Sequence, residues 1–240
     1  MNKAVVLLSG GMDSSTALYW AIKQKHVEVA AAVHFTYGQL GREWEFAAAG
    51  QVNVHASNKA GYPIPLHHVI VPMKQYGLLQ QEGADISPGQ KDSHGNPSTF
   101  IPGRNLIQLA MALPIAYTCD APLIIGGWTQ VDVDYPDCRR RFLESATITL
   151  GLALGEPIDI VYPLIDLAKD KIVALGTELE VPWRLTRSCY SADLVPCGMC
   201  DSCLLRVAAF HQNGMIDPAY RTLEGFKLAK DKAFKQDYLS

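Results

Sequence analysis

One short stretch near the start of the chain gathers glycines, hydroxyls and an acid. It reads SGGMDSS at residues 9–15 and follows an aliphatic run. The run predicts a buried strand and the residues after it predict a helix, so the glycines fall at a strand-to-helix turn. A helix start leaves backbone N–H groups free and favours negative charge, and glycine lets a phosphate approach closely. The stretch therefore predicts an anion site, with an ordinary glycine turn as the alternative.

Two common nucleotide loops are excluded by the same residues. The chain has no Gly-Lys pair, which a Walker loop requires, and no Gly-x-Gly-x-x-Gly run, which a dinucleotide site requires. The predicted phosphate site comprises Leu8, Ser9, Gly10, Gly11, Met12, Asp13, Ser14 and Ser15.

Four of the six cysteines crowd into one segment, as Cys189, Cys197, Cys200 and Cys203. Four thiolates at short spacing are typical of a closed, tetrahedral structural zinc site. Three cysteines in line also suggest an iron–sulfur cluster, and unmetallated thiols are a further alternative. We expect structural Zn²⁺ that staples the loop and takes no part in the chemistry. The staple can still turn Arg187, Tyr190 or Leu194 toward a substrate.

The elements that must position these residues alternate between strands and helices. Strands are predicted at residues 5–8, 27–35, 66–71, 122–127 and 158–162, and helices at 13–25, 42–59, 106–119, 137–154, 170–180 and 204–212. This alternation predicts an α/β fold with a doubly wound, parallel, five-stranded sheet. Such sheets bind ligands beyond the carboxyl ends of their strands, where Tyr37 and Gln39 also fall. We therefore expect Tyr37 and Gln39 to bind the nucleotide together with the phosphate loop.

The remaining segments set the expected domain organisation. Residues 1–182 are predicted to form a nucleotide-binding α/β domain and residues 183–240 a small, zinc-stapled helical subdomain. The aperiodic segment 74–100 is either a lid over the site or an excursion without function. Four lysines after residue 221 are expected on a solvated helix face.

Composition excludes several classes of protein. The chain of 240 residues is 48% hydrophobic and 19% charged, with a net charge of −3 and a pI near 6.1. These values predict no general attraction to nucleic acid or membranes. No apolar run reaches the ~18–20 residues that span a bilayer, and the chain starts without a leader pattern. We expect a cytoplasmic protein.

The Ser-Gly-Gly-x-Asp-Ser pattern resembles the pyrophosphate loop of the N-type ATP pyrophosphatases, which activate an acid or amide by adenylation. The resemblance implies an adenine nucleotide alpha hydrolase-like fold. It also implies that the glycines, Ser9, Asp13 and Ser14 hold the departing pyrophosphate, and that Asp13 helps to hold Mg²⁺ with ATP.

Four further motifs make the resemblance more specific. They are Tyr-Gly-Gln at 37–39, Thr-Phe-Ile-Pro-Gly-Arg-Asn at 99–105, Tyr-Pro-Asp-Cys-Arg at 135–139, and Ser-Cys-Tyr at 188–190 with Cys-Gly-x-Cys-x-x-Cys-x-x-Arg at 197–206. Together and in this order they resemble the 7-cyano-7-deazaguanine synthase family, over residues 9–206.

The resemblance implies an activity and its site. Family members convert 7-carboxy-7-deazaguanine and ammonia to the nitrile with ATP, through an amide, for queuosine or other 7-deazapurines. By resemblance Ser9, Asp13 and Arg104 are catalytic, and Trp128, Tyr135, Asp137 and Arg139 meet the substrate. A homodimer without stable nucleic-acid or membrane partners is implied. The residues alone leave Arg104 open as a structural ion pair, Asp137 as the N-cap of its own helix, and Cys138 as a buried thiol.

One departure from the family concerns residues 131–134, which read Val-Asp-Val-Asp where the family has an acid, an aromatic, Ser and Gly. The change alters the expected base pocket, so a related amide-forming ligase is an alternative function. A non-catalytic, zinc-bearing nucleotide-binding module is an alternative of another class. A tRNA thiolation enzyme would need a reactive, metal-free cysteine and a basic face, which the pI disfavours.

Overall fold

A computed structural model of the chain describes residues 1–72, 89–91, 93–131, 135–220 and 223–235. Most of the segment expected to form a lid, and three of the four residues at 131–134, lie outside the described residues.

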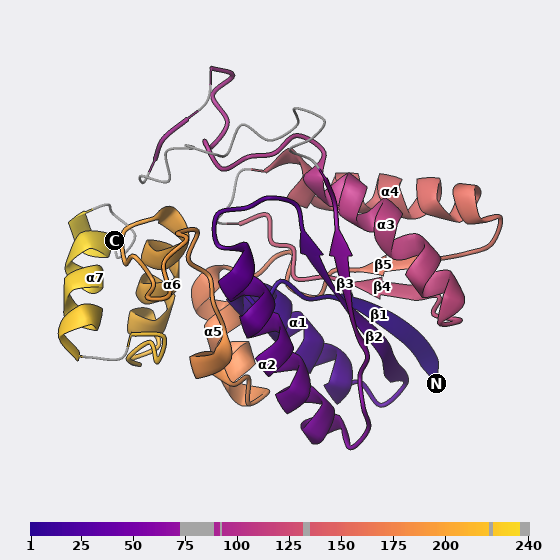
Figure 1. The fold of residues 1–240 in the computed structure, drawn as a ribbon, viewed down its shortest axis with the longest axis horizontal. Coiled ribbons are helices and arrows are strands. Elements are labelled where there is room, and N and C mark those ends of the chain that lie inside the picture. The colour runs from indigo at the N-terminus through magenta and orange to yellow at the C-terminus, as the bar shows by residue number, and fades with distance from the viewer. Residues whose placement is uncertain (73–88, 92, 132–134, 221–222, 236–240) are drawn as a thin grey trace.

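The centre of the fold is a parallel sheet of five strands in the order β3-β2-β1-β4-β5 (Figure 1). Each pair of neighbouring strands is parallel. The strands are β1 (Asn2–Leu7), β2 (Val27–Thr36), β3 (Leu66–Ile70), β4 (Leu123–Ile125) and β5 (Asp159–Val161). The predicted doubly wound α/β fold is confirmed. The order reverses direction between β1 and β4, which is where such sheets hold ligands.

Helices cover both faces of this sheet and make three layers (Figure 1). The α-helices are α1 (Met12–Lys23), α2 (Arg42–Ala60), α3 (Arg104–Thr118), α4 (Arg140–Leu154), α5 (Lys169–Glu178), α6 (Asp201–Gln212) and α7 (Leu223–Lys235). Side chains of β1 alternate between the two cores, as the pleat requires. Val6 packs with α1, α2 and α5, whereas Val5 packs with α3 and α4.

The predicted helix bounds need two corrections. The helix expected from residue 137 begins at Arg140, because residues 136–138 form a short 3₁₀ turn, η2 (Pro136–Cys138). The helix expected from residue 204 begins earlier, at Asp201, so that Cys200 becomes its N-cap. α3 continues through Pro114 to Thr118.

The C-terminal part of the chain packs directly on the sheet domain. After a 3₁₀ turn, η3 (Trp183–Leu185), the chain runs through the cysteine segment into α6. Phe210 of α6 lies in the same core as the α1 side of the sheet, and α7 packs on α6. The division at residue 182 stays a prediction. Among the described helices, none has the length and apolar character needed to cross a membrane.

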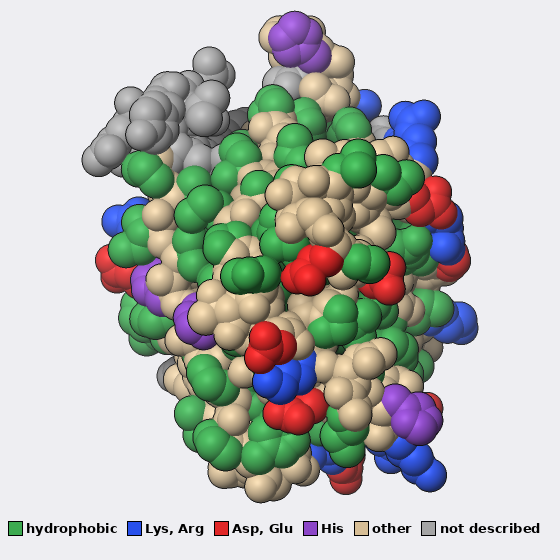
Figure 2. Space-filling view, turned by 90° about the vertical axis from the view of Figure 1, so that its right-hand side faces the viewer, with side chains coloured by type: hydrophobic (Ala, Val, Ile, Leu, Met, Phe, Trp, Pro, Cys, Tyr) green, Lys and Arg blue, Asp and Glu red, His purple; other side chains and the backbone are tan. Residues whose placement is uncertain are grey.

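The α3 and α4 side of the molecule carries many apolar side chains on its surface. Figure 2 shows this side, with hydrophobic groups spread among few charges. The large exposed ones on the two helices are Leu106, Met111, Tyr117, Ile148 and Leu152.

Candidate active site

A cavity of about 280 Å³ opens beyond the carboxyl ends of β1, β2 and β4. Its lining divides into two ends with different chemistry. The phosphate end is lined by Leu8, Ser9, Gly11, Met12, Asp13, Ser14 and Lys169. The base end is lined by Tyr37, Glu45, Arg104, Gln108, Trp128, Tyr135 and Tyr190. The sequence-predicted phosphate loop and several of the predicted substrate-site residues thus share one space.

The phosphate end is built on the N-terminus of α1. Gly11 is its N-cap and has no side chain that could cap the first turn, whose residues Met12, Asp13 and Ser14 line the cavity. Ser14 ties the turn together, because its hydroxyl lies 2.9 Å from Ser9 Oγ and accepts the Ser9 N–H at 3.2 Å. A helix start with hydroxyls beside it is a site for phosphate.

Two glycines are required for this loop to fit its surroundings. Gly10 has φ +83°, and a Cβ there would lie 2.5 Å from the Ala49 nitrogen of α2. Gly127 follows β4, and a Cβ there would lie 2.5 Å from the backbone carbon of Asp13. The second contact shows that the β4 loop rests directly on the first turn of α1.

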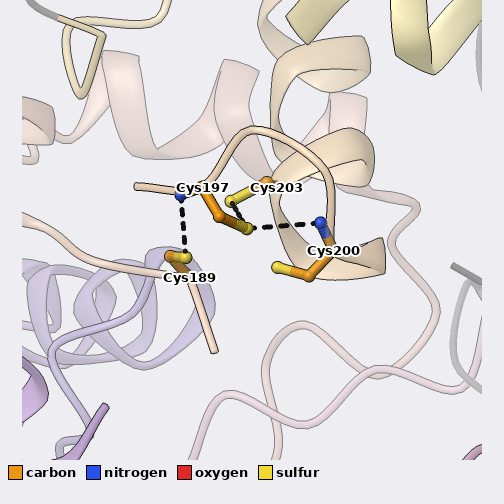
Figure 3. A group of neighbouring side chains, drawn as sticks. All are labelled: Cys189, Cys197, Cys200 and Cys203. Atoms are coloured by element: carbon orange, nitrogen blue, oxygen red, sulfur yellow. Dashed lines mark hydrogen bonds between the residues drawn. The ribbon is translucent and has the colours of Figure 1, made fainter. Parts of the chain in front are cut away.

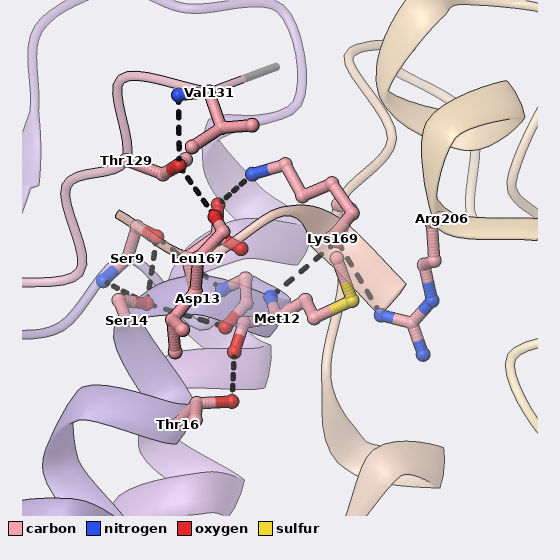
Figure 4. Close-up of polar contacts among 12 residues, drawn as sticks. Ser9, Met12, Asp13, Ser14, Thr16, Thr129, Val131, Leu167, Lys169 and Arg206 are labelled. Carbon is pink, nitrogen blue, oxygen red and sulfur yellow. Dashed lines mark hydrogen bonds and ion pairs between the residues drawn. The ribbon is translucent and has the colours of Figure 1, made fainter. Parts of the chain in front are cut away.

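An ion pair crosses the phosphate end (Figure 4). Lys169 Nζ lies 2.6 Å from Asp13 Oδ2, and the lysine side chain is 11% exposed. The other carboxylate oxygen, Asp13 Oδ1, is buried without a hydrogen-bond partner among the described residues. Lys169 is the first residue of α5, a place where the helix dipole disfavours a cation. The pair therefore puts a positive charge beside the phosphate loop, although a lysine at this position destabilises the start of α5.

The cysteine segment is tied to the phosphate loop through its neighbours. The Arg187 N–H donates to Gly10 O at 2.8 Å, and the Met12 N–H donates to Ser188 Oγ at 3.4 Å. Arg206 of α6 donates to Ser188 Oγ at 3.4 Å and forms a buried ion pair with Asp217 at 2.7 Å. Figure 4 shows Arg206 approaching the loop from this side. Helix α6 and the phosphate loop are thus linked by one serine.

The base end is rich in aromatic rings around one arginine. The Arg104 guanidinium lies 5.6 Å from the centre of the Tyr135 ring, and Phe100 stacks with the same tyrosine at 5.8 Å between ring centres. The Tyr135 hydroxyl lies 2.6 Å from Thr99 Oγ1. Burial raises the pKa of the Tyr37 hydroxyl above its ordinary value, although the Arg104 charge opposes the rise. An arginine among aromatic rings suits a flat ligand that carries an acid group.

A carboxylate also reaches the base end. Glu45 of α2 accepts a hydrogen bond from Gln39 Nε2 at 3.0 Å. Gln39 is held in turn, because its Oε1 accepts the Tyr37 N–H at 2.8 Å and its Nε2 donates to Phe35 O. Burial raises the pKa of the Glu45 carboxyl, and the hydrogen bond from Gln39 opposes the rise.

Asp137 does not have the capping role that the sequence left open for it, and its role as a substrate contact stays a prediction. It is not the N-cap of its own helix, which begins at Arg140. Its Oδ2 accepts the Asn105 N–H at 2.9 Å and so caps α3, the helix that carries Arg104. Cys138 is a buried thiol, as expected from its small size, and burial raises its pKa to about 11.

Several predicted residues lie near the cavity without lining it. Arg139 is exposed at the start of α4, and Ser15 and Gln39 are buried behind the lining. Leu194 lines a separate surface groove, whereas Arg187 and Tyr190 line the cavity as the sequence suggested. The structure therefore brings Arg104, Trp128 and Tyr135 together, and leaves Asp137 and Arg139 outside the lining.

The four clustered cysteines converge on one point (Figure 3). Their Sγ atoms all lie within 4.8 Å of one another, and Cys197 Sγ is 4.0 Å from Cys203 Sγ. Backbone N–H groups of Cys197 and Cys200 donate to Cys189 Sγ and Cys197 Sγ at 3.2 and 3.4 Å. Hydrogen bonds from the other three thiols lower the pKa of Cys189 below its ordinary range. The cluster can hold a metal ion with four sulfur ligands.

Sequence reasoning missed three polar lining residues that bear on the chemistry of the site, Glu45, Gln108 and Lys169. Glu45 gave no signal, since an acid in the first turn of a helix is ordinary. Gln108 lies among apolar residues of α3 and also gave none. Lys169 could have been found, because a lysine at a predicted helix start is unfavourable unless it serves another purpose.

Comparison with known proteins gives consistent matches. The sequence profile of the family described as "Queuosine biosynthesis protein QueC" matches residues 3–214. A 7-cyano-7-deazaguanine synthase from Nostoc punctiforme is 41% identical, over 90% of this chain and 98% of that protein. One from Koribacter versatilis is 38% identical over 90% and 92% of the two chains.

Solved structures with a similar fold include one tRNA-modifying enzyme. The U34-tRNA thiolase NcsA from Methanococcus maripaludis is 14% identical and covers 96% of this chain and 74% of that one. Its TM-score is 0.43.

Proposed function

The chain belongs to the queuosine biosynthesis protein QueC family, and from that premise we propose that it is an ATP-dependent 7-cyano-7-deazaguanine synthase, a ligase that forms carbon–nitrogen bonds. Its substrates are 7-carboxy-7-deazaguanine, ammonia and ATP. The observation that carries the proposal is one cavity that has the glycine-rich start of α1 at one end and an aromatic, arginine-bearing lining at the other.

The proposed reaction uses this cavity twice. A carboxylate oxygen attacks the α-phosphorus of ATP, pyrophosphate leaves, and ammonia displaces AMP to give the amide and a proton. The amide oxygen then attacks a second ATP, pyrophosphate leaves again, and loss of AMP and a proton gives the nitrile. Both activations are attacks by oxygen on ATP, so one phosphate loop serves both.

The residues have separate parts in this scheme. Ser9, Ser14 and the backbone around Gly10 and Gly11 bind the departing pyrophosphate, since N–H and hydroxyl donors at a helix start stabilise that charge. Lys169 adds a cation at the same end, 2.6 Å from Asp13. Arg104 attracts the substrate carboxylate toward the phosphate end.

The remaining predicted contacts belong to the base end. Trp128 and Tyr135 stack on the heterocycle, and Tyr37 closes the pocket beside Arg104. Asp137 acts indirectly, through the cap it gives to α3. Arg139 is a proposed contact for a substrate group outside the cavity.

Mg²⁺ accompanies ATP in this proposal. The buried Asp13 Oδ1 lacks a hydrogen-bond partner among the described residues and offers one oxygen ligand. Mg²⁺ takes its other oxygens from phosphates and water. The ion would neutralise charge on the phosphates.

We propose Zn²⁺ for the cysteine cluster. Four sulfur atoms within 4.8 Å of one another fit a closed tetrahedral shell. Such a shell leaves no open position, so the metal holds the segment that carries Arg187 and Tyr190.

We also propose a homodimer, supported by the exposed apolar side chains of α3 and α4. Light scattering of the purified protein should give twice the chain mass, and the mass of one chain would reject the dimer.

The direct test is the product formed from ATP, ammonia and the 7-carboxy base. Mass spectrometry should show the nitrile, with AMP and pyrophosphate released only when the base is present. Accumulation of the amide would instead support the related amide-forming ligase. ATP binding without turnover would support the non-catalytic nucleotide-binding module.

A further inference from the structure

Glu45 is a carboxylate that lines the cavity away from the phosphate loop. Among the described residues that line the cavity, Asp13 and Glu45 are the two carboxylates. Asp13 is paired with Lys169 at the phosphate end. Glu45 lies at the base end, in the first turn of α2, where Tyr37 and Arg104 also line the cavity.

The Glu45 side chain is held by an ordered support. Gln39 Nε2 donates to Glu45 Oε2 at 3.0 Å, and Gln39 is itself fixed by the Tyr37 N–H at 2.8 Å and by Phe35 O at 3.1 Å. Two backbone contacts on the supporting amide restrict its rotation. A carboxylate has about four lone-pair sites, so Glu45 keeps free acceptor capacity after this one bond.

A carboxylate that lines a pocket for an anionic substrate would repel the acid group of that substrate. It must therefore face another part of the molecule, and Arg104 is the group suited to the acid. A 7-deazaguanine ring carries two adjacent donors, the ring N1–H and the exocyclic 2-amino group. A fixed carboxylate is the matching acceptor, as it is wherever proteins read paired N–H donors.

We propose that Glu45 is a specificity-determining residue, which selects the heterocycle by accepting hydrogen bonds from its N1–H and 2-amino groups. The inference rests on the proposed function and extends it to the edge of the base. Gln39 is its positioning residue. Selection then depends on the 2-amino group, because an analogue without that group leaves the carboxylate short of one donor.

The test compares two bases by equilibrium binding, so that it does not depend on turnover. The probes are 7-carboxy-7-deazaguanine and the same acid without its 2-amino group. The wild-type protein should bind the first ~100-fold or more tightly than the second. Glu45→Gln should reduce that ratio at least ~10-fold, mainly by weakening binding of the 2-amino base.

The matched control is Glu43→Gln. Glu43 lies on the same turn of α2, is exposed, and does not line the cavity. The substitution removes the same charge from the same helix end and should leave the ratio unchanged. Circular dichroism and bound metal should be alike in the wild-type protein and both variants.

Two results would overturn the inference. One is a wild-type protein that binds the two bases within about threefold of each other, which needs no variant at all. The other is a folded Glu45→Gln protein that loses affinity for both bases equally. A wild-type protein that discriminates between the bases but makes no nitrile from ATP and ammonia would reject the proposed function and leave the role of Glu45 standing.

Discussion

The two ends of the cavity are built in opposite ways. The phosphate end comes mainly from one contiguous stretch, residues 8–14, at the start of α1, and its proposed phosphate donors include backbone groups. The base end comes from side chains of five separate segments: the loops after β2 and β4, the first turns of α2 and α3, and the cysteine segment. Backbone sites tolerate little change in local geometry, whereas a side-chain site can be altered one residue at a time. In the proposed function, activation and the choice of substrate therefore depend on different parts of the molecule.

The largest expected effect on activity comes from the cysteine cluster, which holds one segment of the base end. Cys200→Ser should abolish metal binding and lower nitrile formation below detection, because the segment that carries Tyr190 and Arg187 loses the metal ion that holds it in place. Cys200 is fully buried in the cluster, whereas Cys119 lies outside it. Metal analysis and product assays of both serine variants measure this. A metal-free Cys200→Ser protein with full activity would contradict the structural role, and Cys119→Ser should behave as the wild type.

The next effect concerns charge at the phosphate end. Lys169→Ala should lower kcat by about 10²–10³, as removal of a positioned donor does in other enzymes. The variant leaves the Asp13 carboxylate without its lysine beside the nucleotide phosphates. Lys171→Ala is the matched control, since the Lys171 side chain is 70% exposed. Steady-state kinetics should separate the two variants. Equal, small changes in the kcat of both variants would show that Lys169 has no specific part in the reaction.

A smaller effect tests the backbone geometry of the phosphate end. Gly127→Ala should lower the free energy of unfolding by about 2–3 kcal/mol, because its Cβ would lie 2.5 Å from the Asp13 backbone. A Cβ added at Gly50 of α2 would meet no atom within 4 Å, so Gly50→Ala should be neutral or stabilise by up to about 1 kcal/mol. Urea unfolding of both proteins gives the comparison. The reverse order of stability would show that the β4 loop does not rest on α1.

The smallest effect tests whether Asp137 acts as a cap of α3 or as a contact of the substrate. Asp137→Ala should cost about 1 kcal/mol of stability through loss of the α3 cap, and Asp137→Asn should cost less, since its amide oxygen still accepts the Asn105 N–H. The KM for the base should change little in the asparagine variant. An increase in that KM without a change in stability would place Asp137 against the substrate.

The contrast between a contiguous phosphate end and a base end built from separate segments explains what the sequence could predict. The phosphate loop and the sheet follow from local pattern: apolar strands, glycines at a turn, and a helix start. The cysteine cluster follows from spacing alone. Glu45, Gln108 and the capping role of Asp137 could not be predicted, because each depends on which loops meet in space. Asp137 caps α3 through Asn105, which lies 32 residues before it in the chain, and no local pattern records that contact.

The measurement that tests the central claim most directly follows the two carboxyl oxygens of the substrate. With both oxygens labelled with ¹⁸O, each activation transfers one labelled oxygen to AMP. Mass spectrometry should find an unlabelled nitrile and two singly labelled AMP molecules for each nitrile formed. Label in water or in pyrophosphate, or a labelled amide as the final product, would contradict a phosphate loop that activates both the acid and the amide.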